Sequence, residues 1–176
     1  AVYVDYEKIY LSRFKVLRKA YQNSHIEEDQ AYQKFVEENA YWLKDYALYM
    51  AVKNSFGGKS WSEWDEDIRL RKPAAIEKYA GQYAQEIAFY QFQQYLFAKQ
   101  WFALKTYANE KKIQIIGDIP IYVAFDSSDT WANPELFQLD ETLTPTAVAG
   151  CPPDAFSSTG QLWGNPLYRC AYHKET

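Results

Sequence analysis

Two side chains near the end of the chain could bind a sugar. Trp163 lies in the motif QLWGN, where no helical or strand stripe of apolar residues requires it. An indole ring can stack on the apolar face of a hexose and donate one N–H. The neighbouring Gln161 could hydrogen-bond a hydroxyl group or a carboxylate. The alternatives are a tryptophan that pins a loop to the core and a solvated surface amide.

Acidic side chains suggest a second kind of chemistry. Asp118 follows an apolar run of β-branched residues, and acids at the carboxyl ends of parallel barrel strands commonly belong to active sites. Its alternative role is that of a turn residue after Gly117. Asp126 and Asp129, in FDSSDTW, could form a metal pair or a catalytic dyad, but Asp126 or Ser127 more simply caps a short turn.

The two cysteines, Cys151 and Cys170, have no CxxC spacing and no histidine at metal-ligand spacing, since His25 is far away in the sequence. Two isolated thiols are typical of reduced residues in a cytosolic protein. We therefore expect neither a zinc site nor a disulfide scaffold.

Composition bounds the class of protein. The chain has 176 residues, a net charge of −4 and 18% aromatic residues. This acidic balance argues against a nucleic-acid partner, which needs a concentrated basic surface. No apolar run approaches the ~18 residues of a membrane span, and the N-terminus resembles no signal peptide. Because the sequence starts without Met, we expect a chain processed, tagged or cut from a longer one.

The elements that must position these residues are mostly helical. Asp5 can cap a helix that ends near residue 21, and a second helix is predicted over residues 28–53, ended by the glycines of NSFGG. Pro73 suits a first helical position, and a long helix is predicted over residues 83–111. Its predicted buried stripe consists of Tyr83, Ile87, Tyr90, Phe97, Trp101 and Leu104.

The spacing of apolar residues along the chain changes after the long helix. Residues 113–116 (IQII) include three β-branched, apolar isoleucines, which predicts a buried strand. Residues 126–168 are rich in proline and glycine, and so long an irregular stretch is typical of a functional loop or lid. Trp61 and Trp64 could form a remote carbohydrate-binding groove, but we expect burial against the long helix instead.

Long motifs connect the chain to a known family. GDIPIYVAFDSSDTWANPELFQLDE (residues 117–141) and AGCPPDAFSSTGQLWGNPLY (residues 149–168) resemble the 4-α-glucanotransferases, also called amylomaltases or disproportionating enzymes. Further stretches match the same family in the same order: VDYEK (4–8), WLKDYAL (42–48), WSEWDEDIRLR (61–71) and IAFYQFQQYLFAKQW (87–101). The resemblance covers nearly the whole chain.

The resemblance implies a cytoplasmic transferase that moves α-1,4-glucan segments between maltooligosaccharides, with no metal or organic cofactor. It implies a (β/α)8 barrel with helical insertions and a retaining double displacement between two carboxyl groups about 5 Å apart. On this basis residues 1–111 form the helical insertion and barrel-associated helices, residues 112–125 a barrel strand, and residues 126–176 the lid and substrate loop.

The family's nucleophile, acid/base and third carboxylate have no counterpart in this sequence, nor has its Ser-Pro-Tyr stretch. We therefore expect an internal fragment that is inactive alone, and we assign it no catalytic residue. A barrel strand without its neighbours leaves backbone groups unpaired, so self-association of the chain is also expected.

The resemblance also assigns binding residues. Asp118 matches a carboxylate in the donor-side pocket, and Asp154 and Phe156 match the lid over bound glucan, where Ala155 stands in place of a tyrosine found in many members. The match favours sugar contact for Trp163 and Gln161. A further candidate, Asn165, could orient a sugar or cap the turn at Gly164.

Two other functions fit the residues. One is a non-catalytic helical module that binds carbohydrate or protein through its aromatic surface. The other is an amylase-type hydrolase that shares the barrel. Products from maltotriose separate a transferase from a hydrolase, because only a transferase yields longer oligomers.

Overall fold

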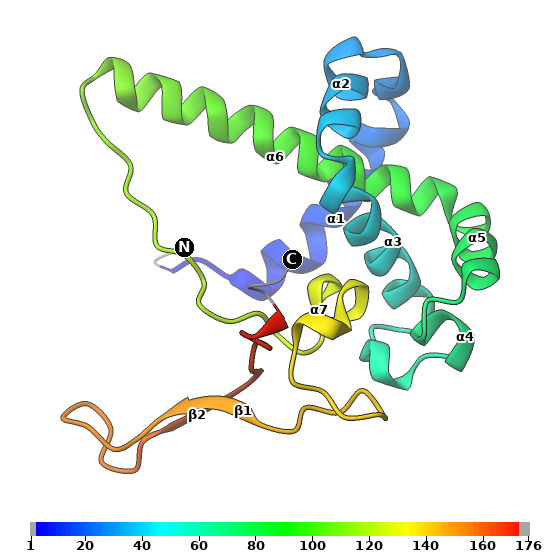
Figure 1. Cartoon of the computed structure of the whole chain (residues 1–176). Coiled ribbons are helices and arrows are strands. Elements are labelled where there is room, and N and C mark those ends of the chain that lie inside the picture. Colours follow the sequence, from blue (N-terminus) through cyan, green and yellow to red (C-terminus); the bar gives the residue numbers. More distant parts are fainter. Residues whose placement is uncertain (1–2, 173–176) are drawn as a thin grey trace. The chain divides into compact units, whose positions relative to one another are not determined.

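A computed structural model describes residues 3–172. The described part is mainly helical and carries one two-stranded sheet (Figure 1). It consists of two compact units, one from residues 3–47 and 83–115 and the other from residues 48–82 and 116–172. Within residues 3–172, no helix combines the length and the apolar character that crossing a membrane requires.

The first unit contains α1 (Tyr6–Gln22), the 3-10 turn η1 (Ile26–Glu28), α2 (Gln30–Glu38), the start of α3 (Ala40–Ser55) and α6 (Ala84–Glu110). Both α1 and α2 pack on α6. The buried core between these helices consists of Ile26, Tyr32, Phe89, Phe92 and Tyr95.

Helix α1 begins as predicted, because the Asp5 carboxylate accepts a hydrogen bond from the backbone N–H of Lys8 at 2.9 Å. A bidentate ion pair joins α1 to α6. The Arg18 guanidinium donates to both carboxylate oxygens of Glu86 at 2.5 and 2.9 Å, and it also lies 4.3 Å from the ring centroid of Phe89. These contacts add to the packing of Phe14, Leu17 and Tyr21 of α1 against the core.

The single helix predicted over residues 28–53 is wrong. The chain forms α2 and α3 instead, with a break at Asn39. The Asn39 side chain donates to the Phe35 carbonyl at 2.8 Å and accepts from the Trp42 indole at 3.1 Å. Asparagine side chains compete in this way with helical backbone hydrogen bonds, so the helix ends there and restarts.

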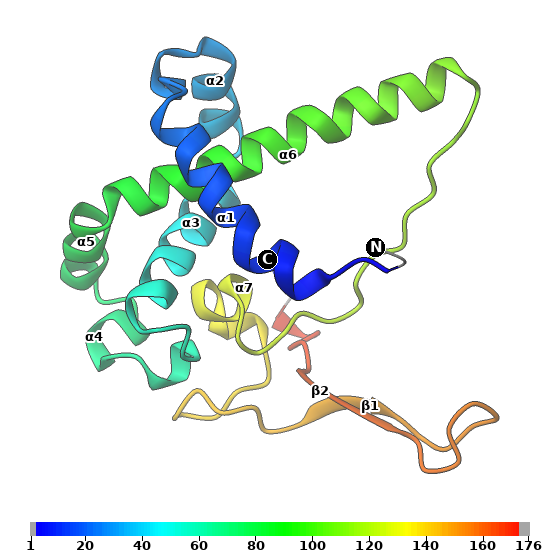
Figure 2. The ribbon, with the colours of Figure 1, turned by 180° about the vertical axis from the view of Figure 1, so that it is seen from behind.

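The long helix α6 begins and ends within a residue of its prediction, but the predicted stripe holds only in its first half. Tyr90 is buried, whereas Phe97 is 65% and Leu104 is 55% exposed. Figure 2 shows the C-terminal half of α6 extending past the other helices of its unit. Phe97, Trp101 and Phe102 of α6 instead line a surface pocket together with Phe35, Tyr41 and Trp42.

The second unit begins with the end of α3. Its other elements are η2 (Trp61–Glu63), α4 (Glu66–Arg69), α5 (Pro73–Gln82), α7 (Ser128–Ala132), η3 (Pro134–Leu136), β1 (Val148–Cys151) and β2 (Gln161–Pro166). Pro73 occupies the first position of α5, as predicted. Gly57 and Gly58, with φ of 67° and 83°, follow α3, which confirms that NSFGG ends this helix.

Buried aromatic rings form the centre of the second unit. The Trp64 ring lies 5.3 Å from Tyr49, 5.8 Å from Phe56 and 5.6 Å from Trp131 between centroids. Trp61 is 1% exposed and lies 5.0 Å from Phe125. Burial of both tryptophans is confirmed, but the rings packed on them come from α3, α7, Phe56 and Phe125 rather than from the long helix named in the prediction.

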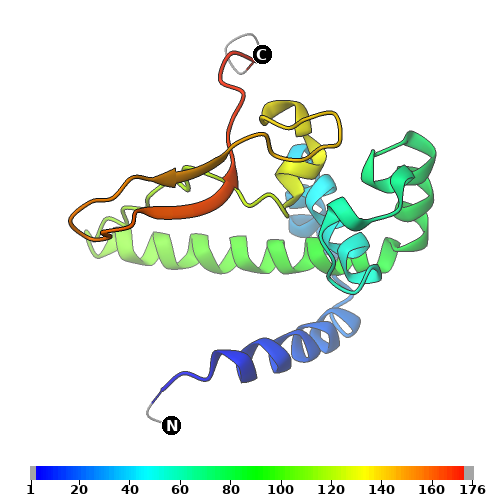
Figure 3. The same ribbon diagram turned by 90° about the horizontal axis from the view of Figure 1, so that it is seen from below.

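The strand predicted at residues 113–116 is absent from the described structure, where these residues have no regular secondary structure. A parallel barrel strand takes its backbone hydrogen bonds from neighbouring strands, and no described strand pairs with these residues. The described sheet is instead an antiparallel hairpin of β1 and β2, which lies inside the stretch predicted to be irregular (Figure 3).

Candidate functional site

The hairpin that carries most of the predicted site residues contains a bulge. Its paired residues are Val148 with Pro166, Gly150 with Leu162 and Cys151 with Gln161. Between the first two pairs, β1 has only Ala149, whereas β2 has residues 163–165. Extra residues in one strand bend it and redirect its side chains, and such bulges are frequent beside active sites.

Trp163 lies in this bulge, and two contacts orient its ring. The indole N–H donates to the Gln161 side-chain carbonyl at 3.0 Å, and the ring centroid lies 6.1 Å from that of Tyr122. Trp163 is 48% exposed. The structure therefore brings Gln161 and Trp163 together and leaves about half of Trp163 free to contact a ligand.

Asn165 has a structural partner in the same unit. Its side-chain N–H donates to the backbone carbonyl of Val123 at 2.9 Å, and the side chain is partly buried. Tyr122 contacts the Trp163 ring and Val123 binds the Asn165 side chain, so residues 122 and 123 help to fix two residues of the bulge. This agrees with a structural role for Asn165.

The hairpin tip places Asp154 and Phe156 in different environments. The Asp154 carboxylate accepts hydrogen bonds from the backbone N–H groups of Phe156 and Ser157, at 2.8 and 2.7 Å. This is an Asx turn that shapes the tip. Phe156 is 97% exposed, so its ring is available for contact with a ligand.

Asp118 is not brought into this group of side chains. It is exposed and lies in a segment without regular structure.

Tyr122 and Tyr168 are aromatic residues that the sequence did not single out. Their rings are nearly parallel, with an interplanar angle of 12° and centroids 6.1 Å apart. Tyr168 also lies 5.3 Å from Phe137. The aromatic surface beside Trp163 is therefore wider than one side chain. A signal was present, because Tyr122 interrupts the aliphatic run IPIYV.

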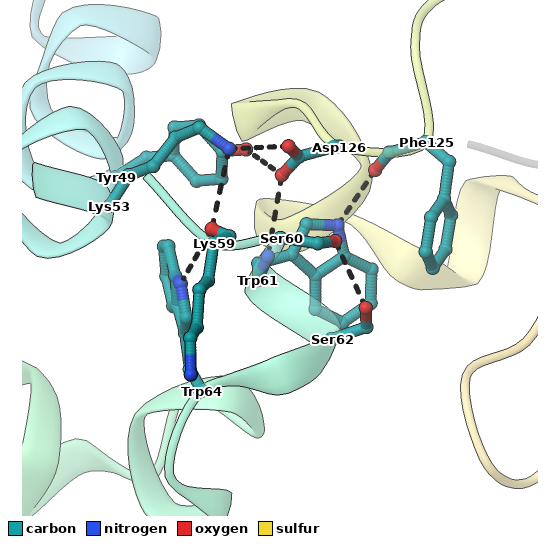
Figure 4. A network of polar contacts seen from close by, with 9 residues as sticks. All are labelled: Tyr49, Lys53, Lys59, Ser60, Trp61, Ser62, Trp64, Phe125 and Asp126. Atoms are coloured by element: carbon teal, nitrogen blue, oxygen red, sulfur yellow. Dashed lines mark hydrogen bonds and ion pairs between the residues drawn. The ribbon is translucent and has the colours of Figure 1, made fainter. Parts of the chain in front are cut away.

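Asp126 lies at the end of the segment that carries Tyr122 and Val123. Figure 4 shows the polar contacts that anchor it. Its carboxylate accepts from the Tyr49 hydroxyl at 2.6 Å and from the Trp61 backbone N–H at 3.3 Å, and it forms an ion pair with Lys53. Ser127, rather than Asp126, caps α7 through its hydroxyl. The predicted cap is thus confirmed at Ser127, and Asp126 binds α3 and Trp61.

The contacts between Asp126, Tyr49 and Lys53, here called the anchor, shift the pKa values of Asp126 and Tyr49. Partial burial alone would raise the pKa of Asp126, but hydrogen bonds from Lys53 and Tyr49 outweigh it and lower the pKa below its ordinary value of 3.8. Burial, reinforced by the hydrogen bond to Asp126, raises the pKa of the Tyr49 hydroxyl far above its ordinary value. At neutral pH the carboxylate is charged and the phenol is neutral.

The possible metal pair at Asp126 and Asp129 finds no further ligands. Within the described residues 3–172, no three His, Cys, Asp or Glu side chains gather in a group that could hold a metal ion. The chemistry that the described site can offer is therefore aromatic stacking and hydrogen bonding.

Comparison with known proteins identifies the family. A family model described as 4-alpha-glucanotransferase matches residues 1–176. The chain belongs to the 4-alpha-glucanotransferase family. This confirms the resemblance seen in the motifs.

Relatives and a solved structure agree with this assignment. The chain is 52% identical over 174 residues to a 4-alpha-glucanotransferase of Clostridium butyricum, covering 98% of this chain and 36% of the relative. It is 45% identical over 170 residues to that of Aquifex aeolicus, covering 97% and 34%. An amylomaltase from Streptococcus agalactiae, solved in complex with acarbose, matches 98% of the chain and 35% of its own with a TM-score of 0.90 and 46% identity. The chain thus spans about a third of the length of these relatives.

Proposed function

We propose that this chain is part of a 4-α-glucanotransferase that transfers α-1,4-linked glucan segments between maltooligosaccharides. Family membership over the whole chain supports the reaction class. The observation that carries the binding role is the half-exposed Trp163, oriented by its hydrogen bond to Gln161 and its ring contact with Tyr122. A flat indole with neighbouring amide groups suits a pyranose ring and its hydroxyls.

Each hairpin residue has a distinct part in this proposal. Trp163 stacks on a glucose unit and Gln161 hydrogen-bonds a sugar hydroxyl or a catalytic carboxylate. The exposed Phe156 covers bound glucan from the tip that Asp154 shapes. Asp118 contributes to the donor-side pocket once the rest of the enzyme surrounds it.

The proposed reaction is a retaining double displacement in a (β/α)8 barrel. One carboxylate attacks the anomeric carbon and a carboxylic acid protonates the leaving oxygen. A sugar hydroxyl then replaces the enzyme on that carbon, so water must be kept out while the intermediate exists. The resemblance assigns these carboxylates to the family's sequence outside this chain.

Within the enzyme, residues 1–111 supply helical and barrel-associated structure, and residues 126–176 supply the lid and substrate loop, with residues 112–125 between them. We further propose a cytoplasmic setting, which the two free thiols of Cys151 and Cys170 suit.

Two measurements test the proposal. In the complete enzyme that contains this chain, maltotriose should yield longer oligomers; a product mixture with only shorter sugars would indicate a hydrolase. In the 176-residue chain, maltoheptaose should shift the indole N–H resonance of Trp163, identified by its loss in Trp163→Phe. Binding without any effect on this resonance would remove Trp163 from the glucan contact.

The alternative of a non-catalytic binding module predicts a different result. Such a module would bind glucan equally well inside or outside a larger enzyme, and no protein containing this chain would form transfer products. The chain alone should show no turnover under our proposal, so only the complete enzyme separates these two functions.

A further inference from the structure

Residues 122–126, here called the bridging segment, make contacts at both ends. At one end, Asp126 binds Tyr49, Lys53 and the Trp61 backbone. Its neighbour Phe125 accepts a hydrogen bond from the Trp61 indole through its carbonyl at 2.7 Å.

The other end of the bridging segment reaches the hairpin. The Val123 carbonyl accepts from Asn165 at 2.9 Å, and the Tyr122 ring lies 6.1 Å from that of Trp163. Between the two ends, the Ala124 carbonyl accepts from the Thr130 hydroxyl at 3.1 Å. All five residues of the segment are thus held, although it has no helix or strand hydrogen bonds of its own.

Two partners of Asp126 lie on helix α3, and one of them is buried in the aromatic centre of the second unit. Tyr49 and Lys53 are four residues apart in α3, so their side chains leave the same face of that helix. Tyr49 is 3% exposed and packs against Trp64 and Trp131. The anchor therefore ties the bridging segment to the aromatic centre of the second unit.

We infer that Asp126 is a positioning residue for glucan binding: by fixing the bridging segment to α3, it sets the place of Trp163. The inference rests on the proposed function and deepens it, because it assigns a part in glucan binding to a residue whose recorded contacts are with α3 and Trp61. Asp126 acts through Val123 and Tyr122 on Asn165 and Trp163.

The charge of Asp126 matters to this role. Hydrogen bonds to an ionised carboxylate are shorter and stronger than those between neutral groups. The lowered pKa of Asp126 keeps it charged at neutral pH. Tyr49 and Trp61 donate to one oxygen of the Asp126 carboxylate, and Lys53 donates to the other. Asp126→Asn replaces one of these two oxygens by an NH₂ group, which is a donor. That group faces either the Lys53 ammonium or the Tyr49 hydroxyl and the Trp61 N–H, and all of these are donors too. Neither arrangement satisfies all the donors.

The test uses the 176-residue chain and two readouts: the Trp163 indole resonance without ligand and the affinity for maltoheptaose. For Asp126→Asn we expect the resonance to move and the affinity to fall on the order of fivefold to tenfold. Lys53→Met should act in the same direction, and Lys53→Arg should restore both readouts because it keeps the positive charge. Measurements are made at a temperature where circular dichroism shows each variant to be folded.

Asp140→Asn is the matched control. The Asp140 carboxylate also accepts several hydrogen bonds, from Thr142 and Thr144, but these close a local turn and involve no residue of the bridging segment. This variant should leave the Trp163 resonance and the maltoheptaose affinity unchanged. If Asp126→Asn does not fold, Tyr49→Phe removes a single hydroxyl and tests the same anchor.

The outcomes separate the inference from the proposed function. A lower melting temperature for Asp126→Asn with an unchanged Trp163 resonance and unchanged affinity would overturn the positioning role and leave Asp126 as a stabilising residue only. The wild-type chain could also fail to bind maltoheptaose while the Trp163 resonance still moves in Asp126→Asn. This result would support the coupling between Asp126 and Trp163 and contradict the proposed glucan contact.

Discussion

The Asn165 side chain and the Val123 backbone, 42 positions apart, are joined by a hydrogen bond of 2.9 Å. Asn165 is the last residue of the bulge in β2, and Val123 belongs to a segment without regular structure. The bond gives the bulge a fixed neighbour and gives an irregular backbone carbonyl a partner. The position of the bulge in β2 therefore depends on that of the segment around Val123.

Asn165→Ala should weaken this link. The Val123 carbonyl loses its donor in a partly buried place, which costs about 1 kcal/mol in the free energy of unfolding and lowers the melting temperature by roughly 2–4 °C. Thermal unfolding followed by circular dichroism measures both. Asn23→Ala is the control, since the exposed Asn23 amide donates to Lys19 at 2.9 Å where water can replace it. An equal loss in both variants would argue against a special role for Asn165.

Trp163 and Trp131 should respond to truncation in opposite ways. Trp163→Ala removes a half-exposed ring, so we expect little change in melting temperature but a loss of glucan affinity worth about 1 kcal/mol. Trp131 is 1% exposed and donates its indole N–H to Ile68 at 3.1 Å. Trp131→Ala should therefore cost about 3–5 kcal/mol of stability.

Thermal unfolding and titration with maltoheptaose give the comparison. The proposal fails at this point if Trp163→Ala lowers the melting temperature strongly while the affinity stays the same, since Trp163 would then pin the hairpin rather than bind sugar.

The parts of the fold that follow from local chemistry could be predicted. Asp5 starts a helix because its carboxylate meets a free N–H in the first turn, and Pro73 starts another because its missing N–H costs nothing there. Gly57 and Gly58 end α3 because they adopt positive φ easily. Each of these depends on a few adjacent residues only. The family motifs similarly pointed to Trp163 and Gln161 as neighbours.

The parts that depend on distant partners could not be predicted. Residues 113–116 have strand composition, but a strand also needs a neighbour to bond with, which the described chain does not provide. The hairpin was missed because its strands are short and contain Gly150, Gly164 and a bulge, so alternation is lost. The anchor at Asp126 joins side chains more than seventy positions apart, and no spacing rule covers such a contact.

The anchor also predicts how stability depends on pH. Because folding lowers the pKa of Asp126 below its ordinary value of 3.8, its stabilising effect is fully present above that value, which holds in the unfolded chain. It is lost as the pH falls through the lower, folded value. The free energy of unfolding of the wild type should therefore exceed that of Asp126→Asn at pH ~5 to 6, and the difference should shrink on acidification.

Urea unfolding of both proteins across the acidic range measures this difference. A gap that stays constant down to pH ~2 would show that the contribution of Asp126 does not depend on its charge.

Two glycines of the hairpin allow a comparison of strain with steric clash. Gly160 and Gly164 have similar φ angles, 72° and 77°. Alanine at either position therefore lowers the free energy of unfolding by about 1–2 kcal/mol, because its Cβ disfavours the left-handed backbone. A Cβ at Gly160 would also lie 2.6 Å from the backbone carbonyl oxygen of Cys151, whereas none lies within 4 Å at Gly164. Gly160→Ala must therefore displace backbone at the tip and should destabilise the protein more than Gly164→Ala.

Thermal unfolding ranks the two variants, and amide exchange at Phe156 and Ser157 locates the damage. These N–H groups are protected by Asp154 in the tip, so they should exchange faster in Gly160→Ala and at the wild-type rate in Gly164→Ala. Equal destabilisation and equal exchange rates would mean that the tip relieves the clash without losing its turn. In that case the shape of the tip would not depend on the close approach of Gly160 to Cys151.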